Sequence, residues 1–477
     1  MEFQYIALAN ELEQKIENGE YKAGDKLPSI RNLHTLTGLS LSTVYSAFIE
    51  LEKRGVVQAR EKSGFFIKPS LDNILPLPKM VSPPVRPQKV SVNALVEFIV
   101  EAGGDPAMLP FGTAMAAIEL LPLKQISRVM RTVLSRYLRT SEIHYGPPAG
   151  IPVLRQQISK RLIGLTSKND ESEILITSGC MDAIQLCLRA VAKPGDTILV
   201  ESPTFVCYLQ LIEDLNMYAL EVSADPVHGI DLNAVKKAID QNKVNACILS
   251  PNFQNPLGFE MPEPAKKELV EMMAKKKIPI IEDDIYGDLY FGDTRPKTLK
   301  SYDQNGMVLY CASFSKTLAP DLRIGFTLPG KFKDQVKRLK INSVMTTSKL
   351  NQFIIAEFLK QGLYDRHLRK LRQAVKIQMA NTARAVAQYF PPNTYITAPK
   401  GGLVLWVQLD KKIDGIKLFE EAIKEKIFIT PGDICSGTGK YGNCIRISCG
   451  HPWNDKMEKG IAKLGKIIEM FLSHPRI

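Results

Sequence analysis

The residues Met307-Val308-Leu309-Tyr310-Cys311-Ala312 form an uninterrupted apolar run, and Ser313-Phe314-Ser315-Lys316-Thr317 follows it directly. Four other short apolar runs end in polar or glycine residues in the same way, at 173–177, 197–201, 246–250 and 279–283. Helical stretches separate these runs. Apolar strands that alternate with helices are typical of a mostly parallel sheet covered on both faces. The sequence therefore predicts an α/β fold that binds its ligands at the carboxyl ends of the strands.

Two of these runs end in side chains suited to pyridoxal chemistry. Lys316 can form a Schiff base with an aldehyde, while the neighbouring hydroxyls and Arg323 can hold a phosphate. Taken alone, a lysine after two serines is most often a surface residue. Asp283 ends the run 279–283 and can keep a pyridine nitrogen protonated. An acidic strand end can also bind a metal or cap a helix, so Asp283 alone leaves three interpretations open.

Two further segments supply polar groups of the same kind. Asn255, within 251–258, can donate a hydrogen bond to a ring oxygen, although an Asn-Pro turn can equally be only a turn. Gly179 opens a helix after the run 173–177, so backbone N–H groups there can cradle a phosphate. Each segment is weak evidence when it is taken by itself.

Together and in this order, the segments resemble those of fold-type I aminotransferases over about residues 100–477. The resemblance implies a pyridoxal 5′-phosphate-binding body with a mostly parallel sheet and a smaller α+β subdomain. It implies that Lys316 forms the Schiff base, that Asp283 faces the pyridine nitrogen, and that Asn255 and Tyr286 bond the ring oxygen. Lys316, Asp283 and Tyr286 would be the catalytic residues.

The same resemblance assigns the remaining contacts. Phe205 would stack on the ring, where many relatives have tyrosine, and Arg446 would bind a substrate carboxylate with its bidentate guanidinium. The phosphate would be bound by Gly179, Cys180, Ser313, Ser315 and Arg323, with Tyr145 reaching the phosphate of a neighbouring subunit. Relatives commonly have Ser-Gln where this chain has Cys180-Met181, so a hydroxyl and an amide donor are lost.

The first seventy residues have a different organisation. A helix over 5–18 ends at Gly19, Ser29 caps a second helix over 30–37, and Ser40 or Ser42 caps a third that runs towards Gly55. Short strands at 56–60 and 65–67 flank a tight turn. The pattern predicts a helix-turn-helix with a wing, although any small three-helix domain with a hairpin has the same periodicity.

The motifs at 27–33, 38–44 and 51–57 resemble the winged helix-turn-helix of GntR-type bacterial regulators over about residues 1–68. This resemblance implies DNA contacts from the second helix, the start of the third helix and the wing. The residues concerned are Arg31, Ser42, Thr43, Tyr45, Ser46 and Lys62. Relatives often carry a basic residue where this chain has Leu41, which puts one expected contact in doubt.

A proline-rich segment separates the two parts. Six prolines lie between Pro69 and Pro87 without a glycine, which predicts a semi-rigid linker over 69–92 that could span roughly 70 Å if fully extended. Such a spacer would allow the heads of a dimer to exchange. We therefore expect a DNA-binding domain at 1–68 and a body at 93–477, with a large subdomain at about 126–345 and a small one from 93–125 and 346–477.

The composition limits which partners, cell compartments and metal sites can be expected for this chain. The 477 residues include 62 basic and 50 acidic side chains, a net charge of +12 that favours anionic partners. The sequence offers no long apolar run, no secretory signal, no CxxC pair and no metal-binding histidine spacing, which predicts a cytoplasmic protein with reduced cysteines and no metal site.

A GntR-like head, a proline-rich linker and an aminotransferase-like body in one chain resemble the MocR subfamily. This implies a transcriptional regulator, a homodimer that binds two DNA half-sites and senses an amino acid, an amine or the vitamer itself. The alternatives are a working aminotransferase with an accessory DNA-binding head, and a DNA-binding protein with an inactive body. Retention of the catalytic-type residues disfavours the last, and fusion to a head favours regulation.

Overall fold

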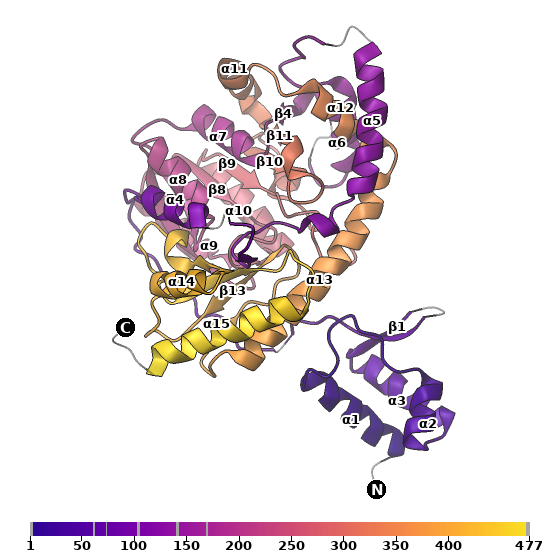
Figure 1. Cartoon of the computed structure of the whole chain (residues 1–477). Helices are drawn as coiled ribbons and strands as arrows, with labels where there is room; N and C mark the ends of the chain where they lie inside the picture. The colour runs from indigo at the N-terminus through magenta and orange to yellow at the C-terminus, as the bar shows by residue number, and fades with distance from the viewer. Residues whose placement is uncertain are drawn as a thin grey trace.

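The structure, a computed structural model, describes residues 3–60, 63–72, 74–102, 105–139, 143–167 and 170–473. A small N-terminal head is joined to a larger body (Figure 1). No helix in the described part of the chain is both long enough and apolar enough to cross a bilayer.

The body is built on a sheet of eight strands in the order β4-β11-β10-β9-β8-β5-β6-β7. The strands are β4 (Leu175–Thr177), β5 (Thr197–Ser202), β6 (Tyr218–Asp225), β7 (Gly229–Ile230), β8 (Ala246–Leu249), β9 (Ile280–Asp283), β10 (Val308–Ser313) and β11 (Gly325–Leu328). Strands β10, β9, β8, β5 and β6 pair in parallel, whereas β11 pairs antiparallel with both neighbours. The α/β prediction and its five apolar strands are confirmed.

Three of the eight strands escape the search for apolar runs, the two-residue β7 and the longer β6 and β11. Strand β6 carries Glu221 and ends at Asp225, and β11 begins at Gly325 and contains Thr327. Their polar residues are buried all the same: Glu221 is 6% exposed and Thr327 is fully buried. Glu221 is satisfied there by Ser202 and Ser436, whose hydroxyls donate to its carboxylate at 2.6 and 2.8 Å.

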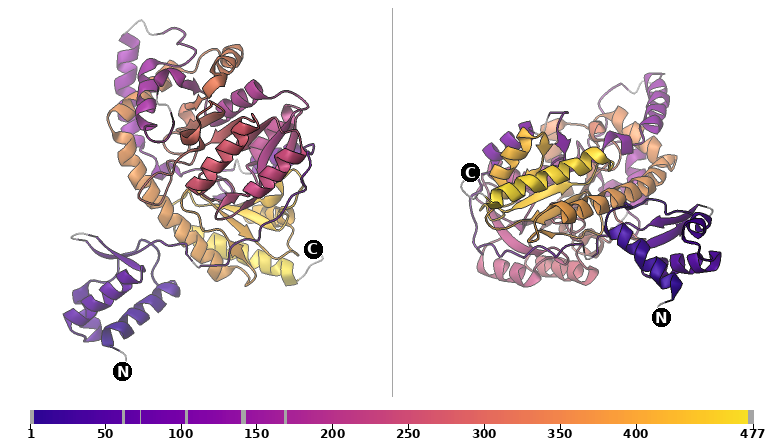
Figure 2. Two further views of the ribbon diagram at one scale, coloured as in Figure 1. Left: turned by 180° about the vertical axis from the view of Figure 1, so that it is seen from behind. Right: turned by 60° about the horizontal axis from the view of Figure 1, so that its bottom comes forward.

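Helices lie against both faces of this sheet (Figure 2), which explains why every residue of β5, β8, β9 and β10 is buried. The helices of this part are α4 (Asn93–Ala102), α5 (Leu123–Arg139), α6 (Pro152–Arg161), α7 (Cys180–Val191), α8 (Val206–Asp214), α9 (Leu232–Gln241), α10 (Glu263–Lys275), α11 (Lys333–Val344) and α12 (Lys349–Lys360). Helix α12 packs against α5 and α6.

A smaller antiparallel sheet completes the body, in the order β12-β13-β16-β15. Its strands are β12 (Tyr395–Ile396), β13 (Val404–Gln408), β15 (Thr430–Pro431) and β16 (Cys444–Ser448), while β14 (Ile427–Phe428) pairs in parallel with β3 (Leu109–Pro110). Helices α13 (Leu363–Tyr389), α14 (Gly415–Lys424) and α15 (Asp455–Ser473) belong to this part, and α13 and α15 lie side by side (Figure 2). The expected smaller α+β subdomain is therefore present.

The head has the predicted winged helix-turn-helix. Helices α1 (Gln4–Glu17), α2 (Ile30–Thr37) and α3 (Leu41–Lys53) precede the antiparallel strands β1 (Val57–Arg60) and β2 (Gly64–Ile67). Leu12, Phe48 and Leu51 are among the residues that form its own apolar core. Of the two candidate caps for α3, Ser40 is the one used, since its hydroxyl accepts the backbone N–H of Thr43 at 3.1 Å.

The proline-rich segment differs from a free spacer because it packs along the body. Leu71, Ile74 and Leu75 pack against the apolar core, and Val90 is 7% exposed. Backbone bonds reinforce this contact, since Gln88 exchanges N–H···O bonds of 2.8 and 2.9 Å with Ala219. Apolar side chains between the prolines explain the difference, because burying them outweighs the extension that proline favours.

Ser40 and Ser42 allow a test of the cap. We predict that Ser40→Ala lowers the local stability of α3 by about 1 kcal/mol, because an N-cap hydroxyl satisfies a backbone donor that otherwise has no partner in the helix. The Ser42 hydroxyl lies 2.8 Å from that of Ser40 but accepts no backbone N–H in the described structure, so the control Ser42→Ala should change it by less than about 0.5 kcal/mol. Hydrogen exchange of the first-turn amides of α3 in the full-length protein measures both, and equal effects would contradict the assignment.

Candidate functional site

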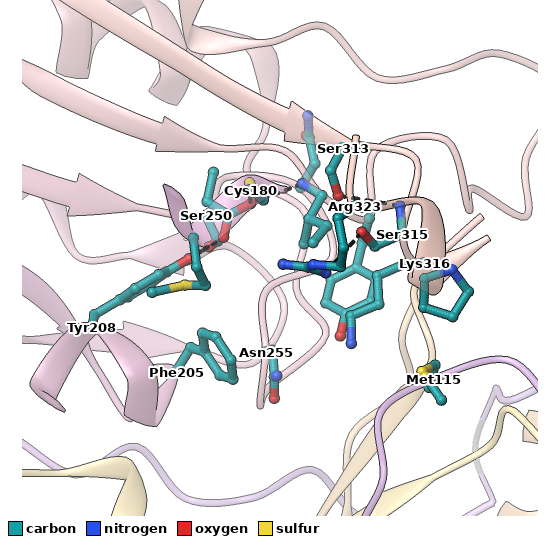
Figure 3. A pocket seen from close by; sticks show the side chains of 16 residues that line it. Met115, Cys180, Phe205, Tyr208, Ser250, Asn255, Ser313, Ser315, Lys316 and Arg323 are labelled. Atoms are coloured by element: carbon teal, nitrogen blue, oxygen red, sulfur yellow. Dashed lines mark hydrogen bonds between the residues drawn. The ribbon is translucent and has the colours of Figure 1, made fainter. Parts of the chain in front are cut away.

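A cavity of about 200 Å³ opens where the parallel strands end, and its walls come from the segments that follow β4, β5, β8, β9 and β10 (Figure 3). The predicted residues that line it are Cys180, Phe205, Asn255, Asp283, Tyr286, Ser313, Ser315, Lys316 and Arg323. Residues separated by more than 140 positions therefore meet in one place, as the strand order requires.

Lys316 lies in the turn after β10, and its Nζ donates to the carbonyl of Ala114 at 2.8 Å. Burial, together with the nearby positive charge of Arg446, lowers the pKa of Lys316 to about 8. A much larger share of this amine is neutral near pH 8 than for a lysine with the ordinary pKa. Since a neutral amine is the nucleophile in Schiff-base formation, the geometry and the pKa suit the predicted role.

Asp283 is a buried carboxylate held by neutral donors. Its oxygens accept from the Tyr208 hydroxyl at 2.5 Å, the backbone N–H of Ile285 at 2.9 Å and the Cys180 thiol at 3.4 Å. Burial raises the pKa of Asp283, and these three bonds counteract part of the rise. No cation forms an ion pair with Asp283 within the described ranges. The cavity thus presents a carboxylate that a cationic partner would stabilise.

Arg323 reaches into the cavity beside Ser315 (Figure 3). Its guanidinium donates to the Ser315 hydroxyl at 3.4 Å and to the Ser178 carbonyl at 3.1 Å, which leaves further N–H groups for an anion. Gly179 lies against it, because a Cβ at Gly179 would stand 2.5 Å from the Arg323 side chain. The N-terminus of α7 begins here, so its unpaired N–H groups add to a phosphate-sized site.

Arg446 reaches the cavity indirectly, through a neighbour that lines it. It is 7% exposed, and it donates to the Asn255 amide oxygen at 3.0 Å and to the Thr430 hydroxyl at 3.0 Å. Because Asn255 accepts with its oxygen, its NH₂ group remains available to donate. The Nε of Arg446 is buried without a hydrogen-bond partner in the described structure. An unpaired buried guanidinium N–H is what a carboxylate ligand would satisfy.

The Cys180 side chain takes a different position from the predicted one. The Cys180 thiol is directed to Asp283 and away from a phosphate, since the carboxylate is the acceptor within its reach. Only the backbone of Cys180, at the start of α7, remains suited to phosphate. Tyr145 does not line the cavity and is 79% exposed, so a role for it requires a second subunit.

Tyr208 is the main residue that sequence reasoning misses. It is 1% exposed, bonds both Asp283 and the Ser250 hydroxyl, and its ring centroid lies 5.4 Å from that of Phe205. A signal was present, because Phe205 is the N-cap of α8 and Tyr208 follows it by three positions, close to one helical turn. Met115 also lines the cavity and comes from a loop with no comparable signal.

In the head, the expected DNA contacts that the structure describes are exposed or half-buried. Arg31, Ser42 and Tyr45 are exposed, and Thr43 and Ser46 are half-buried. Lys62 lies outside the described residues. Leu41, Tyr45 and Ile49 expose apolar surface at intervals of four along α3, a face suited to the methyl groups of thymine in a major groove.

Comparison with known proteins connects this geometry to a family. Residues 4–67 match the bacterial regulatory proteins of the gntR family, and residues 121–464 match the aminotransferases of class I and II. The HTH-type transcriptional regulator YjiR of Escherichia coli is 35% identical over 97% of this chain and 98% of its own, and YdcR of the same organism is 36% identical over 98% and 99%. This chain belongs to the MocR-like GntR regulators. It is thus a DNA-binding regulator fused to an aminotransferase-like body.

Solved structures similar to the body of this MocR-like regulator are aminotransferases. Kynurenine aminotransferase of Pyrococcus horikoshii, in complex with PMP, has 27% identity and a TM-score of 0.74 over 80% of this chain and 97% of its own. LysN of Thermus thermophilus, complexed with N-(5′-phosphopyridoxyl)-L-leucine, has 27% identity and a TM-score of 0.72 over 79% and 95%. The cofactor of this fold is pyridoxal 5′-phosphate.

The described residues of this regulator fit that cofactor. Arg323, Ser315 and the start of α7 would hold the phosphate, and Phe205 would cover the ring. Asp283 would oppose the ring nitrogen, where a positive charge supplies the missing partner of the buried carboxylate. When bound, pyridoxal phosphate supplies an aldehyde and an electron sink. The protein's own contribution is the amine of Lys316 and a largely enclosed site.

Lys340 offers a matched control for Lys316, because burial lowers the pKa of both lysines to about 8 but Lys340 bonds the carbonyl of Pro148, away from the cavity. We predict that Lys316→Ala removes the protein-bound visible absorbance that remains after free pyridoxal phosphate has been desalted away, and that Lys340→Met keeps it. Borohydride trapping followed by peptide mass spectrometry locates the attachment. A trapped adduct elsewhere in Lys316→Ala would contradict the assignment.

The pKa of Lys316 also predicts a pH profile. Only the neutral amine attacks, so the rate at which cofactor-free protein acquires visible absorbance should increase as pH rises and level off above about 8. Stopped-flow measurements between pH 6 and pH 10 test this with ~1 μM protein. A rate that keeps increasing up to pH 10 would show that the amine retains an ordinary lysine pKa.

Proposed function

We propose that the body of this regulator senses an amino acid or amine at the cavity around Lys316 and passes the signal to the DNA-binding head. One observation carries the proposal: a single helix, α13, contacts both places. The helix has 27 residues and is therefore about 40 Å long. Figure 1 shows it extending from the upper body down to the head.

The upper end of α13 holds the turn that contains Lys316. The Tyr364 hydroxyl bonds the Thr317 hydroxyl at 2.6 Å, and His367 donates through Nε2 to the Thr317 carbonyl at 2.7 Å. Any rearrangement of this turn when a ligand reacts with Lys316 therefore acts directly on α13. A buried helix moves as a rigid element, so the displacement is carried along its length.

The lower end of α13 holds the head. The Asn381 side chain accepts the backbone N–H of Ala23 at 2.9 Å and donates to the Ala23 carbonyl at 3.4 Å. Both residues are buried. Lys22 adds an ion pair of 2.6 Å to Glu458 of α15. The head is thus tied to the same helix that supports the Lys316 turn.

The proposal includes a homodimer that presents two heads to two DNA half-sites. Leu123, Met130, Leu134 and Leu138 expose apolar surface along α5, with Tyr145 exposed beyond it. An apolar helix face of this kind requires a partner, and a symmetric second copy would bring Tyr145 towards the other cavity. A regulator of bacterial DNA acts where the chromosome is, so we place it in the cytoplasm.

A working aminotransferase is the second candidate. It is favoured by the completeness of the cavity, which holds the Lys316 amine and the Asp283 carboxylate, and by the orphaned Nε of Arg446, whose guanidinium bonds the lining residue Asn255. The two candidates differ in what a bound amino acid does: in an enzyme it is consumed repeatedly, whereas in a sensor it changes DNA affinity. In a sensor, we expect a coupling free energy of about 1–3 kcal/mol between ligand binding at the cavity and DNA binding at the head.

The contact at Asn381 makes the proposal testable. Operator DNA is first obtained by in vitro selection with the full-length protein. Amino acids and amines are then titrated against the visible spectrum with and without this DNA. In the wild type we expect the two midpoints to differ by about 5-fold or more, because the coupling is reciprocal. Asn381→Ala should bring the curves together without altering the starting spectrum.

The matched control is Asn233→Ala, at an exposed position on α9 that touches neither the head nor the cavity. It should behave as the wild type. Coincident curves in the wild type for every ligand that reacts, together with sustained turnover when a keto acid is added, would move the assignment to the aminotransferase.

A further inference from the structure

A second and larger cavity, of about 890 Å³, lies between the head and the body. Its volume is within the range of roughly 300–1,000 Å³ typical of small-molecule sites. It shares no lining residue with the cavity around Lys316. Its walls come from the end of α3, the residues after β2, helix α13 and the loops at 291–292 and 398–400.

The lining of this cavity, which we call the seam cavity, is strongly cationic. Its charged residues are the cations Arg54, Lys68, Lys376, Arg384 and Lys400 and the acids Glu13 and Asp72. Arg54 is already neutralised, since it bonds Glu13 at 2.7 Å and Glu50 at 3.0 Å. Four cations and one acid remain. None of these four cations forms an ion pair with another residue that the structure describes.

Two of the four are partly withdrawn from water. Burial lowers the pKa of Lys376 and the nearby Lys68 lowers it further, while Asp72 and Asp293 counteract only part of the decrease. Burial also lowers the pKa of Arg384, whose Nη1 is a buried atom with no hydrogen-bond partner among the described residues. Like charges gathered in a half-buried site are costly to the folded protein unless an anion joins them.

We propose that the seam cavity is a binding site for a small phosphorylated molecule that carries at least two negative charges. The Arg384 guanidinium can bond phosphate oxygens as a fork, and the lysines supply compact positive charges around it. The cavity has room for considerably more than one phosphate group. Its volume of about 890 Å³ is many times the roughly 30 Å³ that one water molecule occupies in the liquid. A phosphorylated metabolite fits these observations better than a lone inorganic ion.

The position of the cavity argues for a small molecule over the DNA backbone. Arg54 follows the last residue of α3, whereas Ser42 and Thr43 lie in its first turn. With 13 residues, α3 is about 20 Å long, so the seam cavity lies at the end remote from the predicted base contacts. The cavity is also closed on the other side by α13 and the body.

A ligand here would bridge the head and the body. Lys68 directly follows the wing, while Lys376 and Arg384 project from the helix that carries Asn381. The bound anion would therefore favour the arrangement in which the head is docked. This effect is independent of the amino-compound sensing proposed above, since the two cavities are separate, and the two proposals can fail separately.

Calorimetric titration with pyrophosphate tests the site in the full-length protein. Pyridoxal phosphate is bound first and its free excess is removed, so that the phosphate site near Arg323 is filled while the seam cavity stays open, and ionic strength is held constant because salt screens such contacts. We expect saturable binding to the wild type. Lys376→Met combined with Arg384→Met should weaken it by about 10-fold or more, as expected when charge-assisted hydrogen bonds are lost.

Two further variants keep the result interpretable. Arg338→Met removes an exposed cation from α11, at the opposite end of the body from the head (Figure 1), and should bind as the wild type does. Lys68→Met changes an exposed residue of the head and should weaken binding even if the double variant folds poorly. Bound pyrophosphate should also slow hydrogen exchange at 19–25, where the head meets α13.

Three results would overturn the proposal. The first is the absence of saturable heat with the wild type. The second is equal affinity in Lys68→Met and the wild type. The third is a loss of DNA affinity in Lys68→Met at constant salt without any binding of pyrophosphate, which would make the seam cavity a contact for the DNA backbone.

Discussion

Parallel pairing of β9 with β10 is the constraint on which the rest of the site depends. It places Asp283 opposite Cys311, two residues before the turn that leads to Lys316. The three successive acids at the end of β9 are all buried, and each has its own partners. Glu282 accepts backbone N–H groups of Leu299 and Lys300, and Asp284 pairs with Arg295 at 2.7 Å. Asp283 has neutral donors alone and is the one of the three that lines the cavity, which leaves it available to a cationic ligand.

Much of this was predictable from residues whose local signals are strong. The five apolar strands, the capped helices of the head and the residues that follow the strand ends could all be identified from pattern and motif. What could not be identified was set by tertiary packing. Tyr208 acquires its importance from the orientation of α8, and the Cys180 thiol takes Asp283 as its acceptor because α7 starts beside β9. Neither relation exists within one segment of sequence.

The two cavities depend on different parts of the chain, but the same helix borders both regions. Near one end, α13 supports the Lys316 turn through Tyr364 and His367, and further along it presents Ile377, Asn381 and Gln388 to the turn between α1 and α2. Gly24 is required there, since its φ is +87° and a Cβ would stand 2.9 Å from Ile377. The close approach of the head to the body therefore rests on a backbone that only glycine adopts easily.

The packed proline-rich segment has a consequence for how such proteins are recombined. The aminotransferase family match begins at 121, yet the chain already covers the body from Leu71 onwards and bonds the edge of β6 through Gln88. A graft that exchanged the head at residue 92 would strip apolar surface from the recipient body and invite aggregation. The better fusion point for a chimera lies just after Ile67. The last strand of the wing ends there, and the chain has not yet reached the apolar core of the body.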